Sequence, residues 1–314
     1  MPGDIVPGGA SVHAGAPGGP VPADGASLSP LANVGATRDV LQRFRLSTKK
    51  ALGQHFLVSD GIVRHICQLA QVGEGDSILE IGPGIGTLTC ALLASGARVA
   101  AVERDADLVP VLEHTCGAYL PDALRIVNLD ALELGASNLP FAPAKLVANL
   151  PYAVAATLVL DVFQKLASVQ SATVMVQQEV AQRMMARPGT KDYGAFTVKL
   201  ALHAQPAGHF NVAPGNFFPP PRVNSTVIRL ERCQTAREED VVQAACIMAD
   251  ASFATRRKTI ANSCRTYFAG CGMSCDAAGI LEAAGIDPTR RGETLSVEEY
   301  VRLGEAALAK GLAC

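Results

Sequence analysis

The sequence predicts an α/β fold, with a Rossmann-like, mostly parallel sheet followed by a small all-α domain. Three observations support this. The segment Ile78–Gly86 (ILEIGPGIG) reads as a buried strand that turns through glycines into a helix. Strand and helix patterns then alternate as far as residue 177, and from residue 238 onward the pattern is only helical. Since parallel strands need crossover connections, this alternation places helices on both faces of the sheet.

The 314 residues suffice for about two domains. Residues 1–36 are rich in Gly, Pro and Ala with almost no charge, which predicts a disordered low-complexity tail. They carry no basic segment of the kind that begins a secretory signal. We therefore expect a tail at 1–36, a sheet domain at 37–235 and a helical domain at 236–314.

Composition limits the partners and the compartment. With a net charge of −2 and a pI near 6.3 there is no overall basic field, so any nucleic-acid binding must come from a local patch. The nine cysteines are odd in number and scattered, which is typical of reduced thiols in the cytoplasm. No metal site is expected, because only Cys271 and Cys275 have close spacing. No apolar run reaches the length of a membrane span.

The elements follow from hydrophobic periodicity and from capping and breaking residues. A short helix at 39–44 and a helix at 62–70 precede the sheet. The expected strands are 77–81, 98–102, 124–128, 145–148 and 172–177, and the helices between them are 87–95, 105–119 and 154–166. Further strands are expected at 196–204, 208–212 and 225–230, as an antiparallel edge. Helices are expected at 240–252, 257–267, 276–284 and 297–309, the last with a capping box formed by Ser296 and Glu299.

The spacing of the glycines limits the classes of ligand that this turn can bind. Gly82, Gly84 and Gly86 give the pattern G-x-G-x-G, and Thr87 stands where a dinucleotide-binding turn would have its third glycine. No Lys-Ser/Thr pair follows, so the turn is not a phosphate-binding P-loop. A bulky nucleoside lying against bare backbone fits the pattern. A plain glycine turn of an α/β domain is the alternative.

Two acids follow the next two strands. Glu103 ends the second strand, about 20 residues beyond the first glycine, where an acid can accept hydrogen bonds from ribose hydroxyls. Asp130 follows the third strand and could accept from an adenine amine. Either acid alone could be a solvated carboxylate. Their joint placement at successive strand ends favours a nucleoside site.

The fourth strand ends in Asn149-Leu150-Pro151-Tyr152, which we call the tetrad. The Asn149 side-chain carbonyl and a main-chain carbonyl can accept hydrogen bonds from an exocyclic NH2 group, Pro151 fixes the turn, and Tyr152 offers a stacking face. Together with the glycine turn, the tetrad predicts a site for a planar base that carries an amine.

The segments LEIGPGIGTLT, NLPY, KKALGQHFL and NFFPPPRVNS together resemble the small-subunit (16S) ribosomal RNA adenine dimethyltransferase family, from about residue 49 to the C-terminus. The resemblance implies a class I methyltransferase fold that uses S-adenosylmethionine and no metal. It implies dimethylation of N6 on two adjacent adenosines near the 3′ end of the 16S RNA. It also implies a cytoplasmic role in maturation of the 30S subunit. We expect a monomer.

The resemblance also assigns site residues. The cofactor contacts it implies fall on His55, Leu57, Gly82, Glu103, Asp130 and Asn149, and the glycine turn adds Gly84. Pro-rich residues 217–225 match the family's Phe-x-Pro-x-Pro-x-Val-x-Ser pattern. We expect Phe217 to clamp a flipped base against Tyr152, while Phe218 packs elsewhere. The carbonyl groups of Asn149 and Leu150 would aim the amine at the methyl donor without a strong general base.

RNA contacts are expected from local basic residues. Arg256, Arg257 and Lys258 should begin a helix of the small domain, and Arg222 lies in the Pro-rich segment. Lys49-Lys50 and the segment 191–194 are weaker candidates. A solvated surface is the alternative for any such cluster. Two other functions stay open: dimethylation of large-subunit (23S) RNA, and non-catalytic assistance of ribosome assembly.

Overall fold

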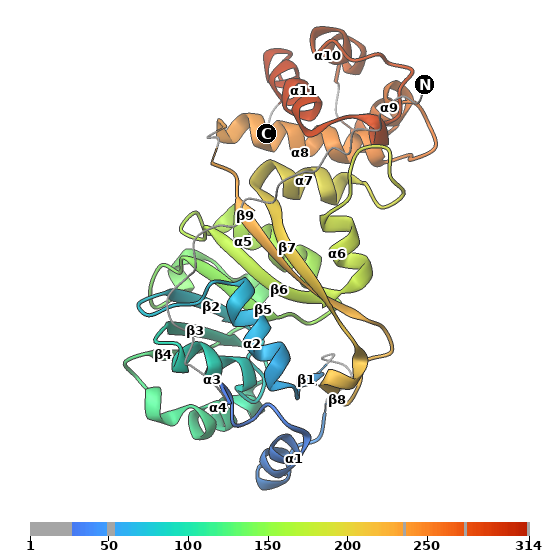
Figure 1. Ribbon diagram of the computed structural model, residues 1–314. Coiled ribbons are helices and arrows are strands. Elements are labelled where there is room, and N and C mark those ends of the chain that lie inside the picture. The colour runs from blue at the N-terminus through green and yellow to red at the C-terminus, as the bar shows by residue number, and fades with distance from the viewer. Residues whose placement is uncertain (1–26, 49–53, 235–236, 273–274, 313–314) are drawn as a thin grey trace, which may run out of the picture.

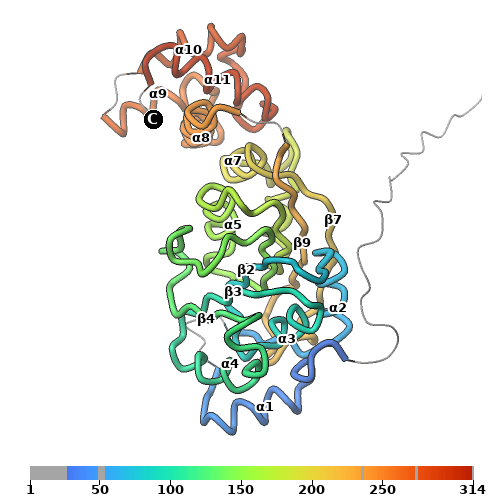
Figure 2. Tube along the Cα trace, turned by 90° about the vertical axis from the view of Figure 1, so that its left-hand side faces the viewer, coloured from blue at the N-terminus to red at the C-terminus, as the bar shows by residue number. Residues whose placement is uncertain are grey.

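The computed structural model describes residues 27–48, 54–234, 237–272 and 275–312. A larger part built around one sheet carries a small helical domain at one end (Figures 1 and 2). In the described residues no helix combines the length and the apolar character needed to cross a bilayer.

The central sheet has seven strands in the order β4-β3-β2-β5-β6-β9-β7. The first five strands are parallel, and β9 runs antiparallel to both β6 and β7, as expected for a parallel sheet with an antiparallel edge. The strand bounds are β2 (Ser77–Ile81), β3 (Arg98–Glu103), β4 (Leu124–Asn128), β5 (Lys145–Asn149), β6 (Ser171–Gln177), β7 (Ala204–Val212) and β9 (Ser225–Arg232). A separate two-stranded ribbon pairs β1 (Phe56–Leu57) with β8 (Phe217–Phe218).

Helices cover both faces of the sheet. On one face α2 (Asp60–Leu69) and α3 (Thr87–Ala94) pack with alternate strand residues such as Ile78. On the other face α5 (Ala155–Lys165) and α6 (Gln178–Met184) pack with Leu79 and the strand residues that share its side. This two-sided burial explains why the parallel strands are almost entirely apolar.

The predicted helix at 105–119 is broken into shorter pieces. A 3₁₀ turn at Ala106–Leu108 leads into α4 (Val109–Thr115), and a second 3₁₀ turn spans Gly117–Tyr119. The pieces nevertheless occupy the predicted place between β3 and β4.

The helical domain at the C-terminus is confirmed. It comprises α8 (Glu239–Phe253), α9 (Ile260–Gly270), α10 (Ala277–Ala283) and α11 (Val297–Ala309), and α11 begins with the expected capping box of Ser296 and Glu299. The N-terminus of α9 lies three residues later than predicted, so that residues 257 and 258 belong to the preceding turn.

The predicted strand at 196–204 is wrong, because α7 (Ala195–His203) occupies this stretch. Both sides of α7 are buried. Leu200 belongs to the core of the sheet, whereas Val198 and Leu202 belong to the core of the small domain. A helix that is apolar on two sides has no clear amphipathic period, and its sequence therefore resembles a buried strand.

The predicted tail is also too long. Residues 1–26 lie outside the described part, but Leu28, Leu31 and Ala32 are buried in the core beside α2 and α3. Asn33 then caps α1 (Val34–Arg43), because its side chain accepts a hydrogen bond from the amide of Ala36. Residues 28–36 therefore belong to the folded part of the protein and not to a disordered tail.

Candidate active site

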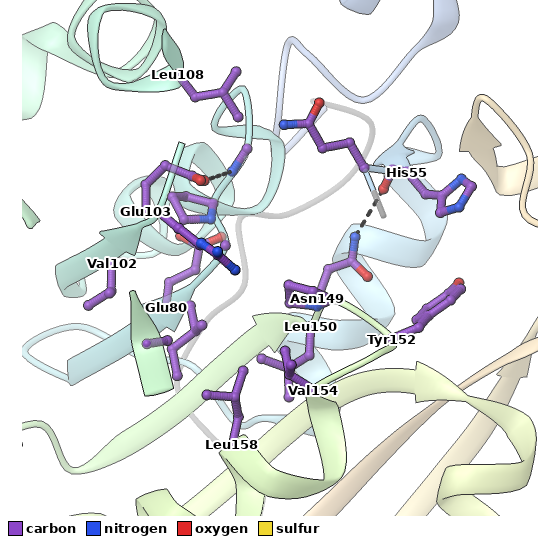
Figure 3. A pocket seen from close by; sticks show the side chains of 18 of the residues that line it. His55, Glu80, Val102, Glu103, Leu108, Asn149, Leu150, Tyr152, Val154 and Leu158 are labelled. Atoms are coloured by element: carbon purple, nitrogen blue, oxygen red, sulfur yellow. Dashed lines mark hydrogen bonds between the residues drawn. The ribbon is translucent and has the colours of Figure 1, made fainter. Parts of the chain in front are cut away.

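A cavity of about 460 Å³ lies where β2, β3, β5 and β6 end, together with the glycine turn and β1. Ligands of open parallel sheets bind at this edge. Glu80 and Glu103 lie on one side of the cavity, and His55, Asn149 and Tyr152 lie on the other (Figure 3). The residues that line it include His55, Leu57, Gly82, Gly84, Glu103, Asp130, Asn149, Leu150, Pro151 and Tyr152.

The glycine turn has the backbone that its sequence demands. Gly82, Gly84 and Gly86 have φ values of 70°, 62° and 93°, in the left-handed region that side chains disfavour. A Cβ atom on Gly86 would lie 2.9 Å from the Sγ of Cys116, so this position has no room for a side chain. The turn therefore brings bare backbone to the cavity wall.

Glu103, the last residue of β3, connects this strand to the glycine turn by a hydrogen bond. Its Oε2 accepts a hydrogen bond from the amide of Gly84 (3.2 Å), and its Oε1 accepts one from the amide of Asp105 (2.8 Å). Burial raises the pKa of the Glu103 carboxyl, and these backbone amides partly oppose that rise. Each carboxylate oxygen keeps a second lone pair, which can accept from a ribose hydroxyl.

Asp130 lies at the neighbouring strand end, as predicted. Its Oδ1 accepts from the amide of Leu132 (3.1 Å), and its Oδ2 lies 3.3 Å from the Nε of Arg104. These two contacts fix the carboxylate at the cavity edge.

The Asn149 amide is oriented by a partner far away in the sequence. Its Nδ2 donates to the main-chain carbonyl of His55 (3.2 Å), which leaves Oδ1 to accept from a ligand. The His55 ring in turn donates from Nδ1 to the carbonyl of Pro219 (2.7 Å). His55 thus joins β1, the tetrad and the Pro-rich segment, and its main chain is what contacts Asn149.

The other three residues of the tetrad also make specific contacts with the surrounding protein. The Leu150 amide donates to the carbonyl of Met175 (3.1 Å) on β6, and Pro151 packs 3.6 Å from the position of a Cβ on Gly82. The half-buried Tyr152 ring faces the His55 ring, with ring centres 5.8 Å apart and planes inclined by 24°. The tetrad is therefore a fixed wall of the cavity.

Glu80 is a site residue that the sequence did not identify. It is 1% exposed, and burial raises the pKa of its carboxyl to about 8. Within the described residues, Glu80 Oε2 and Thr87 Oγ1 are buried without a hydrogen-bond partner, and both residues line the cavity. A positive group that binds beside the buried Glu80 carboxyl favours its ionised form, so this unpaired carboxyl and the Thr87 hydroxyl suit a cationic ligand that carries N–H groups. They therefore fit S-adenosylmethionine, whose sulfonium and ammonium groups are positive.

Phe217, which we expected to clamp a flipped base against Tyr152, does not line the cavity. Phe217 is 3% exposed and packs in the core with Leu57, its partner in the β1–β8 ribbon. Phe218 points to the other side of the ribbon, where the Arg38 guanidinium lies 5.1 Å from its ring centre. Neither ring is among the cavity-lining residues. Within the described part of the chain, His55 is the aromatic side chain that the structure places opposite Tyr152.

The predicted RNA-binding residues do not form one patch. Arg222 is exposed in the loop between β8 and β9. β8 lies far from the small domain, toward the other end of the molecule (Figure 1). Arg257 and Lys258 are exposed in the turn before α9. Lys49 and Lys50 lie outside the described residues.

Arg256 is exposed like its two neighbours but differs from them in that its guanidinium contacts other residues of the protein. Its Nε lies 3.1 Å from Glu293 Oε2, and its Nη2 donates to the main-chain carbonyls of Tyr193 and Lys191. Arg256 therefore joins the small domain to the loop before α7. The expectation that all three residues form one free RNA-binding surface is corrected for this one.

We compared the chain with known proteins. The family model described as ribosomal RNA adenine dimethylase matches residues 45–303. Proteins named ribosomal RNA small subunit methyltransferase A are similar to it: that of Alkaliphilus oremlandii is 40% identical, over 84% of this chain and 93% of its own length. That of Leifsonia xyli is 39% identical, over 85% and 95%.

Solved structures support the fold. A dimethyladenosine transferase from Plasmodium falciparum has a TM-score of 0.68 at 22% identity, with 82% of this chain and 98% of that one covered. The 23S rRNA methyltransferase ErmE has a TM-score of 0.59 at 23% identity, with 80% and 99% covered.

In the described residues no group of three or more His, Cys, Asp or Glu side chains is arranged to hold a metal ion. The chain belongs to the ribosomal RNA adenine dimethylase family.

Proposed function

We propose that this protein transfers methyl groups from S-adenosylmethionine to N6 of two adjacent adenosines near the 3′ end of small-subunit ribosomal RNA, on immature 30S subunits. The observation that carries the proposal is the orientation of Asn149. Because its Nδ2 is bonded to the His55 carbonyl, its Oδ1 is available to accept a hydrogen bond from an adenine amine. The names of the relatives support small-subunit RNA as the substrate.

The cofactor, when bound, supplies an electrophilic methyl group on a sulfonium. The residues that would hold it are the glycine turn and Glu103, with Asp130 at the adenine end and Glu80 beside the positive groups. Leu57 and the main chain of His55 close the cavity from the β1 side. This arrangement supports a donor on one side of the cavity and an acceptor at the tetrad.

The tetrad acts on the acceptor base. The base must first leave its stack in the RNA, and the Tyr152 ring then offers it a stacking face. The Asn149 Oδ1 and the Leu150 carbonyl accept from the two amine hydrogens, which draws the nitrogen lone pair out of conjugation with the ring. Such positioning contributes up to about 7–11 kcal/mol in well-oriented systems, so no strong general base is required.

The direct test uses immature small subunits from cells that lack the N6-dimethyl modification, incubated with the protein and methyl-deuterated cofactor. Mass spectrometry of nuclease fragments should find two labelled methyl groups on each of two adjacent adenosines, and none with Asn149→Ala. A parallel incubation uses unmodified large subunits, and label found only in their RNA would favour the 23S alternative. Subunit binding without any label would favour a non-catalytic assembly factor.

The exposed Arg222, Arg257 and Lys258 are proposed to contact phosphates of the RNA. We further propose that the protein acts as a cytoplasmic monomer. Sedimentation with and without subunits tests the oligomeric state, and a stable dimer would contradict this part of the proposal.

A further inference from the structure

Tyr152 has a contact that no role described so far explains. Its hydroxyl oxygen lies 2.6 Å from the Oγ of Ser225, within hydrogen-bond distance. Burial raises the pKa of the Tyr152 hydroxyl, and the hydrogen bond with Ser225 partly opposes that rise. The tetrad is therefore joined to the last residue of the Pro-rich motif, 73 positions further along the chain.

Ser225 lies at a rigid point of the sheet. It is completely buried, and it begins β9, where it pairs with Gln177 of β6 on one side and with Val212 of β7 on the other. A side chain with strand partners on both sides has little freedom to move. By contrast, Tyr152 lies in the turn after β5, where backbone hydrogen bonds alone leave a ring free to rotate about χ1 and χ2.

We propose that Ser225 is a positioning residue for methyl transfer: through its hydroxyl it fixes the plane of the Tyr152 ring against which the acceptor base stacks. This inference rests on the proposed function. It assigns Ser225 no contact with the cofactor, and it explains why the Pro-rich motif ends in a hydroxyl residue at the start of β9. A ring held in one plane would present the amine to Asn149 in one orientation.

The test is a double-mutant cycle with Ser225→Ala and Tyr152→Phe, because each removes the same hydrogen bond and Tyr152→Phe keeps the stacking face. The matched control is Thr226→Val on the next residue of β9, whose Oγ1 donates to Asn211 Oδ1 (2.9 Å) at similar burial. Measurements are kcat and KM for methylation of immature small subunits, the Kd of S-adenosylhomocysteine by calorimetry, and the free energy of unfolding.

We expect both single variants to lower kcat by about 10-fold, in line with the loss of one hydrogen bond, with KM and cofactor Kd changed by less than about two-fold. The double variant should have the same kcat as either single one. Its stability should nevertheless recover, since no buried hydroxyl is left unpaired. Thr226→Val should lose stability without losing kcat.

Three results would overturn the inference: a wild-type kcat in Ser225→Ala or in Tyr152→Phe, multiplication of the two losses in the double variant, or recovery of kcat together with stability. If Ser225→Ala fails to bind S-adenosylhomocysteine, the inference is judged by Tyr152→Phe alone: a lowered kcat supports it, and a wild-type kcat overturns it. Failure of the wild-type protein to methylate any subunit would refute the proposed function, and would be seen before any variant is compared.

Discussion

Replacing Glu80 by glutamine tests whether a buried carboxyl was retained for the cofactor at a cost in stability. The folded chain holds the Glu80 proton up to about pH 8, whereas the ordinary value for this group is 4.5. Below pH 4.5 the Glu80 carboxyl is protonated in both the folded and the unfolded chain, so it does not lower the free energy of unfolding. Above it the unfolded chain ionises first, so the free energy of unfolding falls as pH rises towards 8.

The size of the effect follows from the difference between the two pKa values of Glu80. Each pH unit between 4.5 and 8 corresponds to about 1.4 kcal/mol, so at pH 7 the penalty reaches about 3 kcal/mol as an upper bound. Glutamine has the same shape but does not ionise. Glu80→Gln should therefore be more stable than the wild type by up to this amount at pH 7, and equally stable near pH 4.5.

The assay is urea unfolding of both proteins without cofactor between pH 4.5 and 8. Glu103 and Cys116 interact electrostatically with Glu80, so the difference between the two stability curves reports the Glu80 carboxyl together with these interactions. The control is Glu133→Gln, the same change at a carboxyl exposed to water. In parallel, Glu80→Gln should bind S-adenosylmethionine more weakly. Stability curves that stay parallel across this pH range would refute the reasoning.

The remaining predictions concern the tetrad, the glycine turn and the basic residues. Asn149→Ala should abolish methyl transfer while filter binding shows nearly unchanged affinity for subunits; full methylation would contradict the role of its Oδ1. Gly86→Ala should lower the free energy of unfolding by about 2–4 kcal/mol in urea titrations, since it forces a side chain into a left-handed, crowded position. A wild-type midpoint would disprove the steric argument. Replacing Arg257 and Lys258 together by alanine should flatten the salt dependence of RNA binding. Arg256→Ala should instead lower the free energy of unfolding. If Arg256→Ala flattened the salt dependence and the double variant lost stability, the roles assigned to these residues would be wrong.

The part of the site that could be predicted from sequence is the part that strand ends define. Since parallel strands end at one edge, Glu103, Asp130 and Asn149 could be brought to one cavity by counting strands, and all three line it. Glu80 was visible beside the glycines, but its complete burial results from helices packing over the turn. That burial, and the raised pKa that follows, cannot be read from neighbours in the chain.

Two errors have the same origin in tertiary packing. The two-residue ribbon of β1 and β8 decides which way Phe217 points, and so short a pairing leaves no periodic pattern in the sequence. The segment 196–204 contains residues that favour strands, but contacts with two cores select the helix. In both cases partners distant in sequence outweigh local preference.

The position of α7 has a consequence for the architecture. With Leu200 in one core and Val198 and Leu202 in the other, this helix is shared by the two parts of the molecule. The buried Tyr193, which precedes α7 in the chain, packs in the small-domain core and donates from its hydroxyl to the carbonyl of Leu295 in the same core. The two hydrophobic cores are therefore not separate from each other, because both include residues of α7. The sheet part and the helical domain therefore share one helix in their packing, and separating them would expose either Leu200 or Val198 and Leu202 to water.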